Sequence, residues 1–177
     1  MKMIFNRQLL KEKRNFAASF LMQENTAKVF HDAADLIMDS LEILDLNPLN
    51  TLELGARSGI CSAKLQDFYP NSAITATDIS PLLLVSNPIK RQILCDDETF
   101  YLNADKKFDL VIANIFANTI IELYDYIVKK QPKVIIMSGF FEDQIPNILK
   151  RYQEQYMTLN ITKLNKWATL SLQCIED

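Results

Sequence analysis

Histidine and cysteine, which often build metal sites and acid–base pairs, are scarce in this chain of 177 residues. The single histidine, His31, falls in a helix-like segment near the amino terminus, where a solvent-facing position is the simpler interpretation. The three cysteines are scattered and odd in number, which argues against a disulfide framework and against a metal site. We therefore expect no metal, a reducing compartment, and no obvious constellation of general bases.

Long apolar runs are also missing. No stretch of 18 apolar residues occurs, and the first residues lack the apolar segment of a signal peptide. Apolar residues make up 49% of the chain and charged residues 23%, which is ordinary for a globular protein, and the net charge of -3 argues against non-specific binding to nucleic acid. These features predict one cytoplasmic domain over residues 1–177, most simply a monomer, with no membrane or nucleic-acid partner.

Residues 1–46 are predicted to form a helical cap. Between residues 7 and 46 there is no glycine or proline, and apolar residues recur at three- and four-residue steps, with one break expected near residues 23–26. A basic cluster marks the start of this segment and consists of Lys2, Arg7, Lys11, Lys13 and Arg14. The cluster forms either a solvated helix face or a docking patch for an acidic partner.

Residues 47–177 are predicted to form an α/β core. Short apolar runs alternate with helix-like segments, which is typical of a mostly parallel sheet. Strands are expected over residues 51–54, 73–77, 91–94, 108–113, 133–137, 157–164 and 167–175, and helices over residues 60–68, 119–130 and 143–156. The predicted fold class is therefore a Rossmann-like, seven-stranded, mostly parallel sheet with an antiparallel hairpin at its carboxyl end, preceded by helices.

Two of the three glycines, Gly55 and Gly59, lie four residues apart directly after the first expected strand. Glycine lets a backbone turn sharply and lets a ligand approach closely. A strand, a glycine-bearing turn and a helix form the nucleotide-binding corner of a doubly wound α/β domain. Such turns also occur for structural reasons alone. Arg57, between the two glycines, is compatible with a ligand-binding turn if its φ is negative and its side chain points away.

Polar residues follow two other expected strands. Asp78 ends the second strand, where a carboxylate accepts hydrogen bonds from both hydroxyls of a ribose and repels a 2′-phosphate. The alternative role for Asp78 is a helix cap for the segment that begins at Pro81. Asn114 ends the fourth strand and should face the same crevice, because ligands of open parallel sheets bind outside the carboxyl ends of the strands. A turn-capping role fits Asn114 as well.

The order of elements and the segment at residues 53–59 resemble the class I S-adenosylmethionine-dependent methyltransferases. The resemblance implies S-adenosyl-L-methionine as the cofactor, with Glu53 near its methionine end. The sequence departs from the family's pattern at Arg57, where a middle glycine is common. It also implies that Asp96 or Asp97 accepts from the adenine amine, and Asp96 is favoured because it comes first after the third strand. The residues expected to bind the cofactor are Glu53, Gly55, Ala56, Gly59, Asp78, Ile79, Asp96, Asp97 and Asn114. No catalytic residue is assigned.

Two narrower resemblances divide the chain. Residues 108–115, 136–139 and 166–168 are similar to the ribosomal-protein lysine methyltransferases. Residues 4–7, 15–20 and 33–41 are similar to the malonyl-acyl-carrier-protein O-methyltransferases of biotin synthesis. We favour the second family, because a malonyl carboxylate is ionised at neutral pH and needs no general base, whereas a lysine must first lose a proton.

The favoured resemblance implies O-methylation of a malonyl thioester during synthesis of the pimeloyl precursor of biotin. Acyl carrier proteins are acidic, so the basic cluster from Lys2 to Arg14 would dock this partner. Arg57 or a neighbouring cation would hold the malonyl carboxylate.

Three other functions stay open. A ribosomal-type protein N-methyltransferase usually carries a separate recognition domain, for which 177 residues leave no room. A non-catalytic binding module, similar to respiratory-complex assembly factors related to this fold, would keep the cofactor corner. A dinucleotide dehydrogenase would need further parallel crossovers. Phe116, Phe140 and Phe141 follow the fourth and fifth strands and either wall the substrate mouth or pack in the core.

Overall fold

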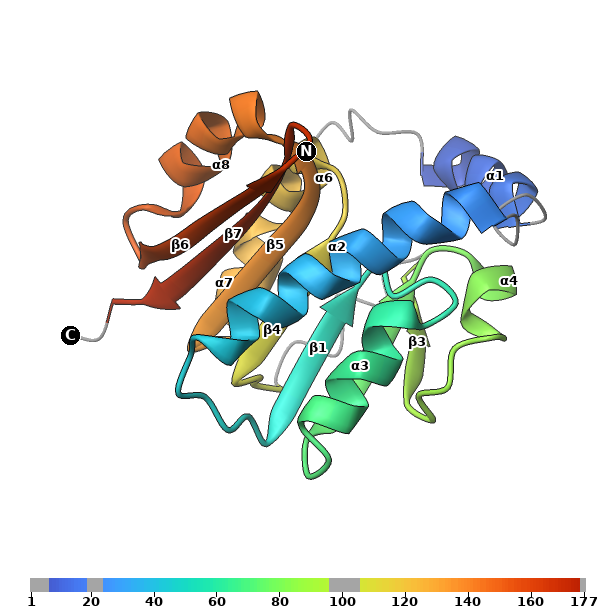
Figure 1. Ribbon diagram of the computed structural model, residues 1–177, viewed down its shortest axis with the longest axis horizontal. Coiled ribbons are helices and arrows are strands. Elements are labelled where there is room, and N and C mark those ends of the chain that lie inside the picture. Colours follow the sequence, from blue (N-terminus) through green and yellow to red (C-terminus); the bar gives the residue numbers. More distant parts are fainter. Residues whose placement is uncertain (1–6, 19–23, 96–105, 176–177) are drawn as a thin grey trace.

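The computed structural model describes residues 7–18, 24–95 and 106–175. Within these ranges a seven-stranded sheet has the order β3-β2-β1-β4-β5-β7-β6 (Figure 1). The strands are β1 (Asn50–Leu54), β2 (Ala73–Asp78), β3 (Gln92–Leu94), β4 (Leu110–Asn114), β5 (Val134–Phe141), β6 (Tyr156–Leu164) and β7 (Trp167–Cys174). Strands β1 to β5 pair in parallel, and β7 runs antiparallel to both β5 and β6. The predicted fold class is confirmed.

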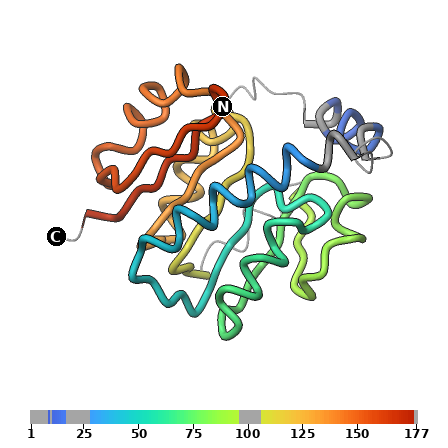
Figure 2. The backbone as a smooth tube through the Cα atoms, in the orientation of Figure 1, coloured from blue at the N-terminus to red at the C-terminus, as the bar shows by residue number. Residues whose placement is uncertain are grey.

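Helices cover both faces of the sheet. On one face lie α2 (Glu24–Glu42) and α3 (Ile60–Phe68), and on the other lie α6 (Ala117–Glu122), α7 (Tyr124–Lys129) and α8 (Ile145–Tyr152) (Figures 1 and 2). The buried residues of β4 alternate between the two layers, since Leu110 and Ile112 pack with α2 and α3 while Val111 and Ala113 pack with α6 to α8. Burial on both sides explains why this strand is a continuous apolar run in the sequence.

The two amino-terminal helices have different roles. In α2, Ala34, Ile37 and Leu41 are fully buried against the sheet layer, as their spacing predicts. In α1 (Arg7–Ala18), by contrast, Phe16 is 72% exposed. Helix α1 packs instead beside the short helix α4 (Pro81–Leu84), at the carboxyl end of β2 (Figure 2). The break expected near residues 23–26 falls partly outside the described residues. Within the described helices, none is long and apolar enough to cross a membrane.

Three elements differ from the prediction. Strand β5 does not end at Gly139 but continues to Phe141, because Gly139 has a φ of +87° and sits at a shift in the β5–β7 register, as in a β-bulge. The helix expected over residues 119–130 is divided into α6 and α7 at Leu123. The last helix is shorter than predicted, because a 3₁₀ turn, η1 (Glu142–Gln144), precedes α8.

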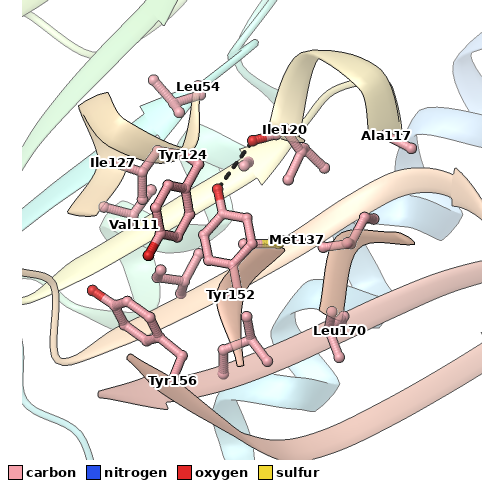
Figure 3. Packing of buried hydrophobic residues seen from close by; sticks show 14 of the residues in the cluster. Leu54, Val111, Ala117, Ile120, Tyr124, Ile127, Met137, Tyr152, Tyr156 and Leu170 are labelled. Carbon is pink, nitrogen blue, oxygen red and sulfur yellow. Dashed lines mark hydrogen bonds between the residues drawn. The ribbon is translucent and has the colours of Figure 1, made fainter. Parts of the chain in front are cut away.

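Tyrosines fill the core beneath α6 to α8. Tyr152 of α8 is fully buried, meets Tyr124 edge to face with ring centroids 4.9 Å apart, and donates a hydrogen bond of 3.0 Å to the carbonyl of Ile120 (Figure 3). Burial raises the pKa of the Tyr152 hydroxyl far above its usual range, so the group stays protonated and remains a donor. The hydroxyl therefore fastens α8 to α6.

Replacing Tyr152 by Phe should lower the free energy of unfolding by about 1–2 kcal/mol, because the buried carbonyl of Ile120 loses this donor. The matched control is Tyr69→Phe, since the buried hydroxyl of Tyr69 has no hydrogen-bond partner within the described residues and its removal should be neutral or stabilising. Urea unfolding of the two variants and the wild type measures both effects. Equal stability of the two variants would contradict a role for the Tyr152 hydrogen bond.

Candidate functional site

Two glycines allow the backbone at the carboxyl ends of β1, β4 and β5 to approach closely, because they have no Cβ atom. At Gly55, with a φ of +77°, a Cβ atom would lie 2.5 Å from Cγ2 of Ile115 and 2.9 Å from the carbonyl oxygen of Asn114. At Gly139, a Cβ atom would lie 2.9 Å from Oδ1 of Asn114. The start of the loop after β4 is therefore packed between the turn that follows β1 and the irregular part of β5 at Gly139, and Asn114 lies between them.

Glu53 lies under the edge, on β1, and is only 1% exposed. Its Oε2 accepts a hydrogen bond of 2.5 Å from the hydroxyl of Ser62, which in turn accepts one of 2.9 Å from the side chain of Asn87. Burial raises the pKa of Glu53 from 4.5 to about 7, against the opposing effect of its hydrogen bonds from Ser62 and Cys61. The nearby carboxylate of Asp78 raises this pKa further.

Asp78, at the end of β2, carries a carboxylate whose side chain is 0% exposed. Its Oδ1 accepts from the backbone amide of Ser80 at 2.9 Å. Its Oδ2 accepts from the backbone amide of Arg57 at 3.1 Å and from Nη1 of Arg14 at 2.8 Å. The side-chain cap of α4 is Ser80, which accepts from the amide of Leu83, so Asp78 is not the cap of this helix.

Helix α1 reaches this edge through two consecutive residues. Arg14 forms the ion pair with Asp78, and Asn15 accepts a hydrogen bond of 2.5 Å from the hydroxyl of Ser80. Both contacts join residues more than 60 positions apart in the sequence. Residue spacing in the sequence does not predict such long-range contacts. From the sequence, Arg14 is therefore predicted only to be part of the basic cluster.

Arg57 differs from the expected geometry. Its φ is +53°, not negative, and its guanidinium lies 3.8 Å from the centre of the Phe30 ring of α2. Burial lowers the pKa of Arg57 to about 10; the neighbouring Arg14 lowers it further and Asp78 opposes the shift. Arg57 lines the pocket at this edge, as does Phe30, against which its guanidinium lies.

The pocket at this edge gathers part of the predicted residue set. Its lining consists of Phe30, Glu53, Gly55, Ala56, Arg57, Ser58, Ile60, Cys61, Leu83 and Asn114. Of the other predicted residues, Gly59 precedes α3 as its N-cap, and Ile79 is nearly buried beside Asp78. Asp96 and Asp97 lie outside the described residues. Phe30 and Leu83 were missed, because apolar residues at helical spacing give no signal that separates a pocket wall from a core.

The three phenylalanines after β4 and within β5 have separate positions. Phe140 is 1% exposed and belongs to the core. Phe116 is 59% exposed, two residues after Asn114. Phe141 is also exposed and its ring lies 4.6 Å from that of Trp167. Core packing is therefore the correct interpretation for Phe140, whereas Phe116 is exposed at the start of α6 and is not among the residues that line the pocket.

The raised pKa of Glu53 predicts a specific pH dependence of stability. Between pH 4.5 and about 7 the folded protein binds more protons at Glu53 than the unfolded chain does, so the stabilising effect is complete below pH 4.5 and is lost as the pH rises through 7. The side chain of Glu53→Gln stays neutral. Between pH 5 and pH 8 the free energy of unfolding of this variant should therefore rise relative to that of the wild type by up to about 3 kcal/mol. Chemical unfolding without ligand at several pH values measures this difference. Glu122→Gln, at an exposed position of α6, is the control. A difference between Glu53→Gln and the wild type that stays constant over this range would contradict the assignment.

The chain is similar to one family of known proteins over most of its length. The family model for ribosomal protein L11 methyltransferase (PrmA) matches residues 30–174. A ribosomal protein L11 methyltransferase from Helicobacter pylori is 31% identical over 150 residues, which cover 80% of this chain and 45% of the relative. One from Caldicellulosiruptor saccharolyticus is 26% identical over 148 residues, which cover 78% of this chain and 48% of the relative. The chain spans about half the length of the curated relatives it matches.

Solved structures share the fold. A ribosomal protein L11 methylase from Lactobacillus delbrueckii subsp. bulgaricus has a TM-score of 0.70 at 24% identity, over 82% of this chain and 80% of that chain. Magnesium protoporphyrin IX methyltransferase from Synechocystis PCC 6803, solved with bound S-adenosylmethionine, has a TM-score of 0.69 at 13% identity, over 99% of this chain and 100% of that chain. The fold is that of the class I S-adenosylmethionine-dependent methyltransferases.

These findings correct the expected partner. The matched family and its curated members are ribosomal protein L11 methyltransferases, so an acyl carrier protein docked through the basic cluster is wrong, and the resemblance to malonyl-acyl-carrier-protein methyltransferases is not supported. The geometry agrees, because Arg14 turns inward to Asp78. Lys2 and the side chain of Arg7 lie outside the described residues. Since the family model covers the chain from Phe30 in α2 to Cys174 in β7, the chain belongs to the ribosomal protein L11 methyltransferase family.

Proposed function

We propose that this chain is an S-adenosylmethionine-dependent methyltransferase and that its acceptor is an amino group of a protein, with ribosomal protein L11 as the first candidate. The proposal is carried by one observation: Glu53, Gly55 and Asn114 line a single pocket at the carboxyl edge, with Asp78 beside it, in a chain of this family. The acceptor is inferred from relatives that are ribosomal protein L11 methyltransferases, of which this chain covers about half.

The chemistry of the pocket fits this cofactor. Glu53 would receive the ammonium group of the methionine end, Gly55 and Ala56 would lie against the ligand, and Asp78 would receive the ribose hydroxyls. When bound, the cofactor supplies a methyl group on a sulfonium, and transfer of that group by in-line displacement depends chiefly on positioning. Gly59 would support the turn. Ile79 remains a predicted cofactor-binding residue, and Asp96 or Asp97 remains the prediction for the adenine amine.

The division of labour along the chain is part of the proposal. Residues 47–177 would hold the cofactor, and residues 1–46 would act as a cap over the site. This division is supported by the origin of two side chains at the edge, because Arg14 comes from α1 and Phe30 comes from α2.

An amine acceptor makes demands that the site can meet in part. A lysine amine has a usual pKa near 10.4 and must be unprotonated to attack, so the site has to bind the neutral form. Asn114 lines the pocket at the end of β4, where its carboxamide would orient such an amine. Phe116, exposed two residues later, would contact the aliphatic part of the acceptor side chain.

Binding of a ribose at Asp78 has a structural condition. An ionised carboxylate offers about four lone-pair positions, and three are filled by Arg14, the amide of Arg57 and the amide of Ser80. Two hydroxyls cannot both bind at the one remaining position. The side chain of Asp78 is also fully covered. Arg14 is the donor that belongs to the cap, so Arg14 must leave Asp78 before the ribose binds.

Incubation of the pure protein with S-adenosylmethionine and ribosomal protein L11 tests the function. We expect S-adenosylhomocysteine and a methylated protein, both measured by mass spectrometry, and no product with malonyl-CoA or malonyl-acyl carrier protein. Asp78→Asn should weaken cofactor binding about 10- to 100-fold if the ribose contact is made. Cofactor binding without any methylated product would favour a non-catalytic module, and no binding at all would refute the proposed site.

Replacing Arg14 by Gln tests the structural condition. The variant should bind S-adenosylhomocysteine roughly tenfold more tightly than the wild type, because the competing donor on Asp78 is removed. Lys13→Gln is the matched control, since it removes the same charge from the same helix at an exposed position. Calorimetry gives both dissociation constants. Weaker binding by the Arg14 variant, or an equal gain by the Lys13 variant, would contradict competition at Asp78.

A further inference from the structure

Arg57 is a partly buried cation without an anionic partner. Its guanidinium forms no ion pair with any carboxylate among the described side chains, and it lies over the face of the Phe30 ring, 3.8 Å from the ring centre. A guanidinium carries five N–H donors. Arg57 lines the pocket together with Phe30, against whose ring its guanidinium lies, so these donors are close to any ligand that enters the pocket.

Among the described side chains, the charges around the pocket leave a positive surplus. Two guanidiniums, those of Arg14 and Arg57, lie near the carboxylate of Asp78, and Asp78 is paired with Arg14. Glu53 does not balance the second cation at neutral pH, because burial raises its pKa to about 7 and leaves it only partly ionised. A partly desolvated cation of this kind is stabilised by an incoming anion.

The backbone of Arg57 adds a second, independent observation. A φ of +53° is unfavourable for a residue that is neither glycine nor asparagine, at a cost of order 1 kcal/mol. Such strain persists where the surroundings impose it, and here the amide of Arg57 is tied to Asp78 and the guanidinium is held against Phe30. The conformation therefore fixes both the turn and the position of the cation.

We propose that Arg57 binds the amino-acid carboxylate of S-adenosylmethionine. Arg57 and Glu53 line the same pocket, and a ligand ammonium beside Glu53 would favour the ionised form of that carboxyl. The two side chains then match the carboxylate and the ammonium of one α-amino acid. The inference rests on the proposed function and deepens it, because it assigns a ligand group to a residue that replaces the glycine common at this place in class I methyltransferases. A planar guanidinium is suited to a carboxylate because it can donate two parallel hydrogen bonds.

Two rival roles for Arg57 predict different binding data. In the first, Arg57 is a clamp that fastens the turn to α2 through Phe30 and touches no ligand. In the second, the side chain obstructs the space that glycine leaves open in related proteins. A pair of ligands that differ only in the carboxylate separates these roles from the proposed one.

The experiment measures dissociation constants by calorimetry for S-adenosylhomocysteine and for its decarboxylated form, S-adenosyl-3-thiopropylamine. The wild type should prefer S-adenosylhomocysteine about 10- to 100-fold. Arg57→Gln should lose most of this preference by weakening S-adenosylhomocysteine while leaving the decarboxylated ligand unchanged. Arg57→Gly, which also removes the backbone strain, should lose the same preference. Affinity for the decarboxylated ligand reports in each variant that the site is still folded.

Every other outcome overturns the assignment. Equal weakening of both ligands would identify Arg57 as a clamp, and tighter binding of both by Arg57→Gly would identify it as an obstruction. A wild type that binds both ligands without preference would refute the role of Arg57 and leave the proposed function standing. A wild type that binds neither ligand would refute both.

Discussion

The covered carboxylate of Asp78 joins four parts of the protein that the sequence keeps apart. It ends β2, holds the turn after β1 through the amide of Arg57, starts the segment of α4 through the amide of Ser80, and anchors α1 through Arg14. A buried carboxylate is costly unless its lone pairs are filled, so each of these donors contributes to keeping the charge inside the protein. This requirement shapes the carboxyl edge of the sheet, because the turn after β1 and helix α1 must lie where they can donate hydrogen bonds to Asp78.

Elements with regular periodicity could be predicted from the sequence, and contacts between distant elements could not. Strands such as β4 and β5 are continuous apolar runs, and Ala34, Ile37 and Leu41 follow helical spacing, so local patterns determine where they lie. Gly55 and Asp78 follow strands directly, which places them at one edge of a parallel sheet. Arg14 and Phe30 reach the same edge from helices whose direction no local pattern sets. The positive φ of Arg57 depends on the hydrogen bond that its backbone N–H donates to Asp78 and on the stacking of its guanidinium on Phe30. Both are tertiary contacts.

The expected acyl-carrier-protein partner, which the family match contradicts, rested on a chemical preference. An ionised carboxylate needs no base, and a chain without a base constellation therefore favours such an acceptor on paper. That preference compares reactions in solution, whereas a protein site changes the pKa of groups it buries by several units, as Glu53 illustrates within this pocket. The length of the chain was also a poor guide to the acceptor. The matched relatives are about twice as long as this chain, so the absence of a recognition domain in 177 residues was no evidence about the acceptor class.

The contact of α1 with Asp78 and the proposed ribose contact are mutually exclusive, and this exclusivity has a thermodynamic consequence. Two ligands that compete for one group are linked reciprocally, so an interaction that stabilises α1 on Asp78 would weaken cofactor binding, and the cofactor would weaken that interaction by the same free energy. The linkage requires no long-range pathway, because both partners use the same lone pairs. A surface that binds the exposed face of α1, where Phe16 is exposed, would therefore be sensed at the cofactor pocket. The amino-terminal helix is in this way part of the binding equilibrium of the site, although it lies outside the sheet and its core.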